Sequence, residues 1–215
     1  MVLFAMCLRG LLFCGFALAA SLGDPSAQFW LGQAYHHGDS ITGISPDAER
    51  AFALLEAAVE SGHVAAWHYW ASLHREGDPW LGVARDPATT RAFLEAAAEA
   101  GDATSCFELA HDAKEGTGGS DVDLARALHW FERAGTMGHA EALCAAGAMR
   151  FHGLGCAQED KAAAAELYKQ AAERGHVGAW INLADMYAAG DGVPRDEALA
   201  RDIQTRILPL LRKKA

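Results

Sequence analysis

Small and apolar residues recur with helical spacing along most of the chain. In one clear segment they occupy the second, fifth, sixth and ninth positions of a predicted helix, as Trp180, Leu183, Ala184 and Tyr187. This spacing places them on one side of the helix. We find no window that alternates between apolar and polar residues over the length of a strand, so a sheet has no candidate segment. The pattern predicts an all-α protein.

Glycines divide the chain into a repeat. The first series recurs at intervals of 39, 39, 37 and 37 residues, at Gly38, Gly77, Gly116, Gly153 and Gly190. A second series keeps nearly the same step, at Gly62, Gly101, Gly138 and Gly175. The predicted repeats are residues 27–65, 66–104, 105–141, 142–178 and 179–215. A fixed period of this size is typical of a solenoid.

Each predicted repeat contains two helices. The first should end at a glycine in the left-handed conformation, and the second should begin at an aspartate whose carboxylate caps the helix. The predicted caps are Asp47, Asp86, Asp123, Asp160 and Asp196. We expect Pro209 to stop the last helix near Leu208, because proline cannot donate the next helical hydrogen bond.

The fifth repeat carries a recognisable motif. Residues 179–187 (AWINLADMY), followed by residues 190–196 (GDGVPRD), resemble a Sel1-like repeat, a branch of the tetratricopeptide superfamily. The ending AAERGH at residues 171–176 belongs to the same signature. The resemblance extends over residues 27–208. It implies a right-handed α-solenoid that assembles protein complexes.

The first twenty residues differ from the repeats. Residues 1–20 contain no acid, one base at Arg9 and an apolar run over residues 11–20, with an A-x-A cleavage site at Ala17 and Ala19. This is typical of a secretory signal, and residues 21–215 would then form a single repeat domain. We expect export to a bacterial periplasm or to the lumen of a eukaryotic secretory pathway. The alternatives are a helix packed on the first repeat, or an uncleaved anchor, the only case in which we expect membrane association.

Composition and charge exclude two classes of protein. The chain is 51% hydrophobic and 21% charged, which is ordinary for a globular protein and argues against disorder. Its 18 Lys and Arg residues against 28 Asp and Glu residues give a net charge of -10. A nucleic acid is therefore not an expected partner.

Catalytic and metal-binding motifs are missing from the sequence. His63, His139 and His176 follow the second series of glycines and are explained by the repeat. The chain has no HExxH zinc motif, no GxSxG nucleophile elbow and no phosphate loop. We therefore predict no cofactor, metal ion or small-molecule substrate, and a non-catalytic scaffold that binds a protein or peptide.

The predicted binding surface is the concave face formed by the first helices. If the core positions are as above, the third, seventh and tenth positions form the opposite stripe. In the first three repeats these are Phe29, His68 and Phe107; Gln33, Ser72 and His111; and His36, Arg75 and Lys114. Trp30 and Tyr69 flank the stripe, and Trp80 is a further candidate in a loop. A basic rank beside an apolar one suits a peptide with carboxylates next to hydrophobic side chains. Alternatively, the third-position side chains only pack against second helices.

An enzymatic role is the main alternative from another class. The cysteine-rich relatives among Sel1-like proteins are linked to β-lactam binding and hydrolysis, and they join consecutive repeats by a disulfide. Here Cys106 would need its partner at Ala98, so that staple is missing. We expect no bridge between Cys106 and Cys144, and we expect Cys156, in a glycine-rich loop, to be the most reactive thiol.

Overall fold

The computed structural model describes residues 14–119 and 121–212, and of residues 208–212 it describes the backbone alone. Within these ranges every regular element is a helix, and pairing between extended residues is limited to two isolated bridges. The all-α prediction is confirmed. No helix in the described ranges is both long and apolar enough to span a bilayer.

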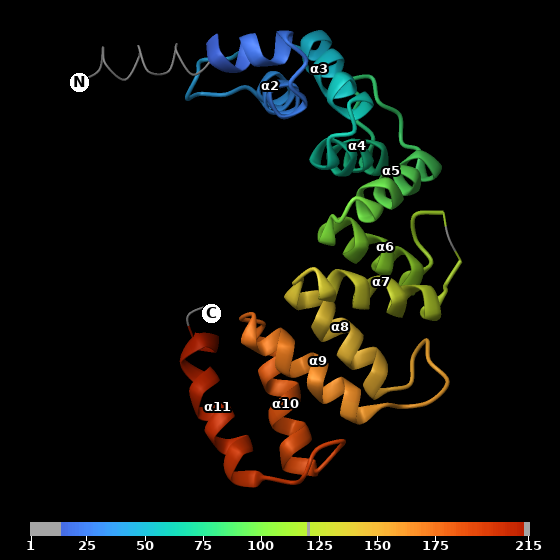
Figure 1. Ribbon diagram of the computed structural model, residues 1–215, viewed down its shortest axis with the longest axis vertical. Helices are drawn as coiled ribbons and strands as arrows, with labels where there is room; N and C mark the ends of the chain where they lie inside the picture. Colours follow the sequence, from blue (N-terminus) through green and yellow to red (C-terminus); the bar gives the residue numbers. More distant parts are fainter. Residues whose placement is uncertain (1–13, 120, 213–215) are drawn as a thin grey trace, which may run out of the picture. The chain divides into compact units, whose positions relative to one another are not determined.

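The N-terminal unit, Met1–Ala100, holds two helical hairpins. A helical segment over residues 14–21 precedes them. The hairpin helices are α2 (Pro25–His37), α3 (Ala48–Glu60), α4 (Val64–Glu76) and α5 (Pro87–Glu99). In Figure 1 these helices are blue to green, and each packs against the next along the chain.

The C-terminal unit, Gly101–Ala215, continues the same alternation of first and second helices. Its helices are α6 (Ala103–Glu115), α7 (Leu124–Thr136), α8 (Ala140–Phe151), α9 (Lys161–Glu173), α10 (Val177–Ala189) and α11 (Glu197–Arg212). Consecutive helices pack side by side from α6 to α11 (Figure 1). Packing between sequence neighbours is the signature of a solenoid.

Side-chain caps explain why the helices begin where they do. All five predicted aspartates cap second helices, and each carboxylate accepts a hydrogen bond from a backbone N–H two or three residues later. Three histidines cap first helices: Nδ1 of His63, His139 and His176 accepts from the N–H three residues on, at 3.2, 3.2 and 3.0 Å. Asp102 takes this place in the third repeat. The histidine after each glycine is thus a helix cap, which requires a neutral imidazole.

The buried face of the first helices differs from the prediction. The fifth and sixth positions are buried in every repeat, as expected. The first and eighth positions are buried as well, at Ala27, Ala66, Ser105, Ala142 and Ala179, and at Ala34, Leu73, Asp112, Met149 and Met186. The second position is only half-buried at Gln28, Trp67 and Trp180. The reason is that helices such as α4, α8 and α10 pack on two second helices, so their buried arc is wide.

Four helix ends also differ from the prediction. The first is that of α8, which ends at Phe151 with His152, not Gly153, as its C-cap. Gly116 and Gly190 adopt the left-handed conformation, whereas Gly38 and Gly77 combine positive φ with an extended ψ of 152° and 142°. The predicted stop near Leu208 is wrong, because α11 continues through Pro209 to Arg212. The φ of proline is itself helical, and near a helix end the loss of one hydrogen bond is tolerable.

The helical segment over residues 14–21 packs on the first repeat. The Phe16 ring stacks on Trp30 with centroids 4.4 Å apart, and Ala20 is buried together with Ala27 and Leu31. This packing is the alternative considered for the N-terminal segment. Cleavage after this segment remains a prediction.

Candidate partner-binding surfaces

In the N-terminal unit the predicted contact residues form a half-buried layer. These residues are Phe29, Trp30, Gln33, His36, His68, Tyr69, Ser72 and Arg75. Phe29 lies edge-on to Tyr69, with centroids 5.8 Å apart, and its ring lies 5.1 Å from that of His63. The Ser72 hydroxyl donates to the Tyr69 carbonyl. These contacts join Phe29 to Tyr69 and Ser72 within the layer.

A polar network lies at the end of α2. His36 Nε2 is 2.8 Å from an Asp78 carboxylate oxygen, and His36 Nδ1 is 2.6 Å from the Tyr69 hydroxyl. The same hydroxyl is 2.8 Å from His37 Nε2. We call His36, His37, Tyr69 and Asp78 the histidine–tyrosine network. It joins α2, α4 and the loop after α4.

Burial controls the ionisation of the network. Burial, followed by the nearby His37, lowers the pKa of His36 against the opposing effect of Asp78. Burial also raises the pKa of Tyr69 to about 12, with a smaller contribution from Asp78. Burial opposes the ionisation of Asp78, but hydrogen bonds from Leu81 and His36 outweigh it and lower the pKa of the carboxyl group. These shifts favour a neutral His36 ring, a neutral Tyr69 hydroxyl and an ionised Asp78 carboxylate.

Trp80 extends this layer into solvent. Its indole stacks on His36 with ring centroids 5.4 Å apart and planes 14° apart, yet 46% of the residue remains exposed. An aromatic ring that is held on one face and open on the other is a typical interface anchor.

In the C-terminal unit, Phe107 belongs to an aromatic cluster. It stacks on His139 at 4.4 Å and lies edge-on to His111 and to Phe131 of α7, at 4.7 and 5.7 Å. Phe107 thus packs against a second helix, which was the alternative to a free groove position. By contrast, Ile181 at the same position of the last repeat is 38% exposed.

The predicted basic rank has members in both units. Arg75 is half-buried near the end of α4 in the N-terminal unit, and Lys114 is exposed near the end of α6 in the C-terminal unit. His36, the third member of this rank, belongs to the histidine–tyrosine network, and its side chain is only 9% exposed. A ladder of these three side chains remains a prediction.

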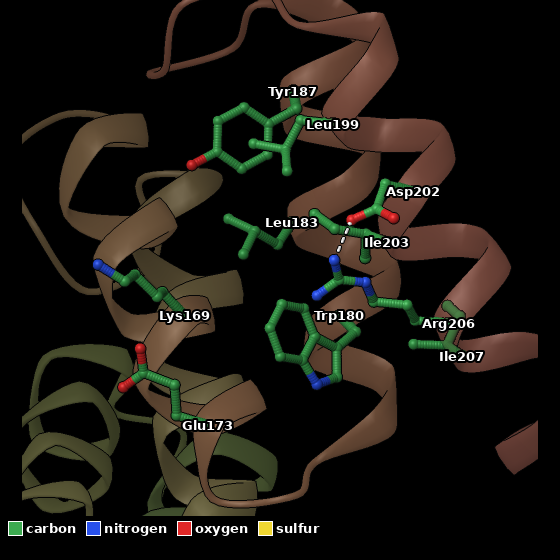
Figure 2. Close-up of a pocket in the computed structure, with 10 residues that line it drawn as sticks. All are labelled: Lys169, Glu173, Trp180, Leu183, Tyr187, Leu199, Asp202, Ile203, Arg206 and Ile207. Atoms are coloured by element: carbon green, nitrogen blue, oxygen red, sulfur yellow. Dashed lines mark ion pairs between the residues drawn. The ribbon is translucent and has the colours of Figure 1, made fainter.

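A groove between α9, α10 and α11 was not predicted from the sequence (Figure 2). It has a volume of about 340 Å³. Trp180, Leu183 and Tyr187 reach it from α10, while Leu199 and Ile203 reach it from α11. Charged side chains border it, including an Arg206–Asp202 ion pair at 2.8 Å.

The preceding junction has different side chains at the positions equivalent to Lys169 and Tyr187. There the Arg150 guanidinium donates twice to one Glu132 carboxylate oxygen, at 2.6 and 2.8 Å, and joins α8 to α7. At the last junction, Lys169 and Tyr187 replace Glu132 and Arg150. The helical spacing in the sequence predicts Trp180 and Tyr187 in the core. Comparing Tyr187 with Arg150 could have indicated that the last repeat is different.

The described cysteines and possible metal ligands do not form a common site. Among the residues that the structure describes, no group of three or more His, Cys, Asp or Glu side chains could hold a metal ion. Burial raises the pKa of the Cys106 and Cys144 thiols. Cys156 is half-buried in the loop before α9.

Comparison with solved structures identifies similar solenoids. A protective antigen of uropathogenic Escherichia coli, c5321, is 28% identical with a TM-score of 0.78; the match covers 89% of this chain and 39% of that one. A Sel1 repeat protein from Oxalobacter formigenes is 27% identical with a TM-score of 0.74, over 85% of this chain and 72% of that one. This chain thus spans well under half of the E. coli protein.

A comparison with protein families matches most of the chain to a single repeat family. The Sel1 repeat matches residues 25–63, 66–102, 103–139, 140–176 and 181–202. A comparison with curated proteins finds no match. The matched segments agree with the helical hairpins, their aspartate and histidine caps and the glycine spacing, and the chain therefore belongs to the Sel1 repeat family.

Proposed function

We propose that this protein is a non-catalytic scaffold that binds a partner protein or peptide through the exposed face of its first helices. The observation that carries the proposal is the layer of rings in the N-terminal unit. Phe29, Tyr69 and His36 hold one another in place, and Trp80 projects from them into solvent. Rings fixed before binding lose little conformational entropy on binding, which favours affinity.

We also propose that the protein is exported and loses residues 1–19 or 1–20. Removal of this segment would strip Phe16 from the Trp30 ring. Trp30 would then join the same surface as a second aromatic anchor. Mass spectrometry of the protein from its native compartment should find an N-terminus at Ala20 or Ser21; an intact Met1 would contradict cleavage.

The chain offers a matched pair of variants to test the binding proposal. Trp80 and Ile41 hold equivalent places, two residues after Asp78 and Asp39, in loops of the same kind. Both side chains are exposed, at 46% and 62%. They differ because Trp80 stacks on His36 within the proposed surface.

The test is quantitative capture of partners from the native compartment. Trp80→Ala should weaken binding of a captured partner at least tenfold, as expected for an aromatic anchor. Ile41→Ala should bind as the unchanged protein does, and circular dichroism should show equal helicity for both. Equal losses in the two variants, or none in Trp80→Ala, would contradict the proposed surface.

A further inference from the structure

The pattern that ends each repeat occurs once more, before the first matched repeat. Gly23 precedes Gly62 by 39 residues, the step that also separates Gly62 from Gly101. Its φ of 87° lies between those of Gly62 and Gly101, which are 76° and 96°. Asp24 then caps α2, because its carboxylate accepts from the Ala27 N–H at 2.7 Å. Gly23 and Asp24 therefore take the places of the glycine and the cap in a repeat.

The helical segment over residues 14–21 also ends as a second helix does. The N–H of Gly23 donates to the carbonyl three residues earlier, and that of Asp24 to the carbonyl five residues earlier, both at 3.0 Å. At the end of α3, Gly62 and His63 make the same two bonds, at 3.0 and 3.1 Å. The backbone of the segment thus has the geometry of a second helix.

Phe16 holds the core position of this additional second helix. It precedes Leu55 of α3 by the repeat step of 39 residues. The equivalent side chains of the next three second helices are buried, as Leu55 is: Leu94, Phe131 and Tyr168. Phe16 itself stacks on the Trp30 ring of α2, with centroids 4.4 Å apart. The apolar pattern therefore agrees with the backbone.

The segment packs on one face of α2, which carries Ala27, Trp30 and Leu31 and which we call the α2 seat. Ala20 of the segment is buried together with Ala27 and Leu31. In the same way, α4, α8 and α10 pack on the second helix before them as well as on the one after. Among the described helices, each extensive contact joins a first helix to a second one. The α2 seat is therefore a surface that accepts a second helix.

Cleavage would uncover this apolar seat, whereas the last described helix has a polar outer face. The exposed residues of α11 from 201 to 206 are all polar. Gln204, one of them, holds the position of Leu55, eight residues after the cap. The terminal repeat of a solenoid needs a polar outer face to keep the protein soluble. The Ala, Trp and Leu side chains of the α2 seat do not supply one once residues 1–20 are removed.

We propose that the mature protein binds an amphipathic helix of a partner protein at the α2 seat, in the place of residues 14–21. The partner helix carries an aromatic side chain where Phe16 lies and a small one where Ala20 lies, because Ala20 is only 6% exposed. The α11 helix of a second copy does not fit this description, since it has the exposed Gln204 at the position equivalent to Phe16. The inference rests on the proposed cleavage and adds the α2 seat to the proposed binding surface.

The probe is a fluorescein-labelled peptide of residues 14–24. A hydrocarbon staple replaces the exposed side chains of Cys14 and Leu18, which lie one turn apart, because so short a helix is unstable in water. Fluorescence anisotropy should show that the probe binds the chain over residues 21–215. The probe with Phe16→Ala should bind at least tenfold more weakly, as expected for an aromatic anchor.

The place of binding is followed at Trp30. The chain is labelled with 5-fluorotryptophan, and its Trp30 resonance, assigned with Trp30→Phe, should shift as the probe saturates the α2 seat. The full chain should bind the probe at least tenfold more weakly, because its own segment occupies the seat. The full chain with Phe16→Asp and Ala20→Asp, which displace the segment, should bind as the shortened chain does, and it replaces that chain if circular dichroism shows a loss of helix.

The binding result is independent of the cleavage result. An intact Met1 in the native compartment would contradict cleavage, but the probe would still report whether the α2 seat accepts a helix. Equal binding of the probe by the full and shortened chains, or no shift of Trp30 in either open form, would overturn the proposal. So would sedimentation that shows a dimer of the shortened chain which the probe does not dissociate, because a second copy would then be the occupant.

Discussion

Loops between first and second helices are built in two different ways in the two units. In the N-terminal unit each loop closes on itself: Asp39 exchanges two backbone hydrogen bonds with Ile44, and Asp78 does so with Val83. In the C-terminal unit the loops after α8 and α10 press against the preceding second helix. Glycines with positive φ occur in both, but for different reasons.

A side chain added at each glycine would meet different surroundings. A Cβ at Gly155 would lie 2.1 Å from the Leu124 carbonyl oxygen, and one at Gly192 would lie 2.3 Å from the Lys161 carbonyl carbon. At Gly43 and Gly82 it would meet nothing within 4 Å. At Gly43 and Gly82 glycine supplies only a backbone conformation, whereas at Gly155 and Gly192 it also permits contact between repeats.

The largest expected difference between the two kinds of loop is the loss of stability when alanine replaces glycine. Gly192→Ala should lower the free energy of unfolding by about 3 kcal/mol, because backbone strain of about 1–2 kcal/mol adds to overpacking of about 1–3 kcal/mol. Gly82→Ala should cost only the strain. Urea denaturation followed by circular dichroism measures both, and equal losses would break the comparison.

Charge-reversal variants should show which of the two units binds the partner. Arg75→Glu in the N-terminal unit and Lys114→Glu in the C-terminal unit, when combined, should weaken capture at least tenfold, which corresponds to about 1.4 kcal/mol. The single variants should apportion this loss between the units. Circular dichroism should show unchanged helicity, with Arg75→Glu the more demanding case because Arg75 is half-buried. Full-strength capture by a folded double variant would place the binding surface elsewhere.

The pH dependence of stability should reflect the histidine cap at His139. Burial lowers the pKa of His139, so the unfolded chain takes up a proton near pH 6.5 before the folded protein does. The free energy of unfolding should therefore fall as the pH drops below about 6.5, by at most about 1.4 kcal/mol per pH unit for this group. His139→Asn keeps a capping side chain that does not titrate. Denaturation between pH 7.5 and 5 should show a shallower slope for this variant; an unchanged slope would contradict the role of His139.

The smallest effect expected is a difference in thiol reactivity. Burial raises the pKa of Cys106 and Cys144 and so disfavours their thiolates. Cys156 lies in the loop that carries Gly155, outside the helices. Alkylation of the native protein, followed by peptide mass spectrometry, should modify Cys156 before the other two. Faster modification of Cys144 would instead indicate that α8 opens more readily than this loop.

The helices could be predicted from sequence because their signals are local. An aspartate cap such as Asp160 is decided by residues within one turn, and the helical spacing around Leu183 needs no knowledge of the partner helix. The wide buried arc could not be predicted, because Met186 at the eighth position is buried between helices of two repeats. The continuation of α11 past Pro209 also went against the local rule.

The surfaces were harder to predict because they depend on contacts between repeats. Tyr69 was singled out as a contact residue, but its bonds to His36 and His37 join separate repeats. The apolar groove at the last junction depends on exchanges such as Arg150 to Tyr187, which matter only relative to the preceding helix. Exposure of Ile181 and burial of Phe107 likewise follow from their neighbours, not from their shared position.

The close seating of Gly155 and Gly192 on the preceding helix has a consequence for how such a chain can change length. A turn such as that at Gly43 or Gly82, where an added side chain would meet nothing within 4 Å, can gain or lose a residue without disturbing its neighbours. A loop whose glycine rests on the backbone of another repeat cannot, because any shift in register puts a side chain into that contact. Changes in length at the loops after α8 and α10 should therefore come as whole repeats, whereas the turns at Gly43 and Gly82 can vary by single residues.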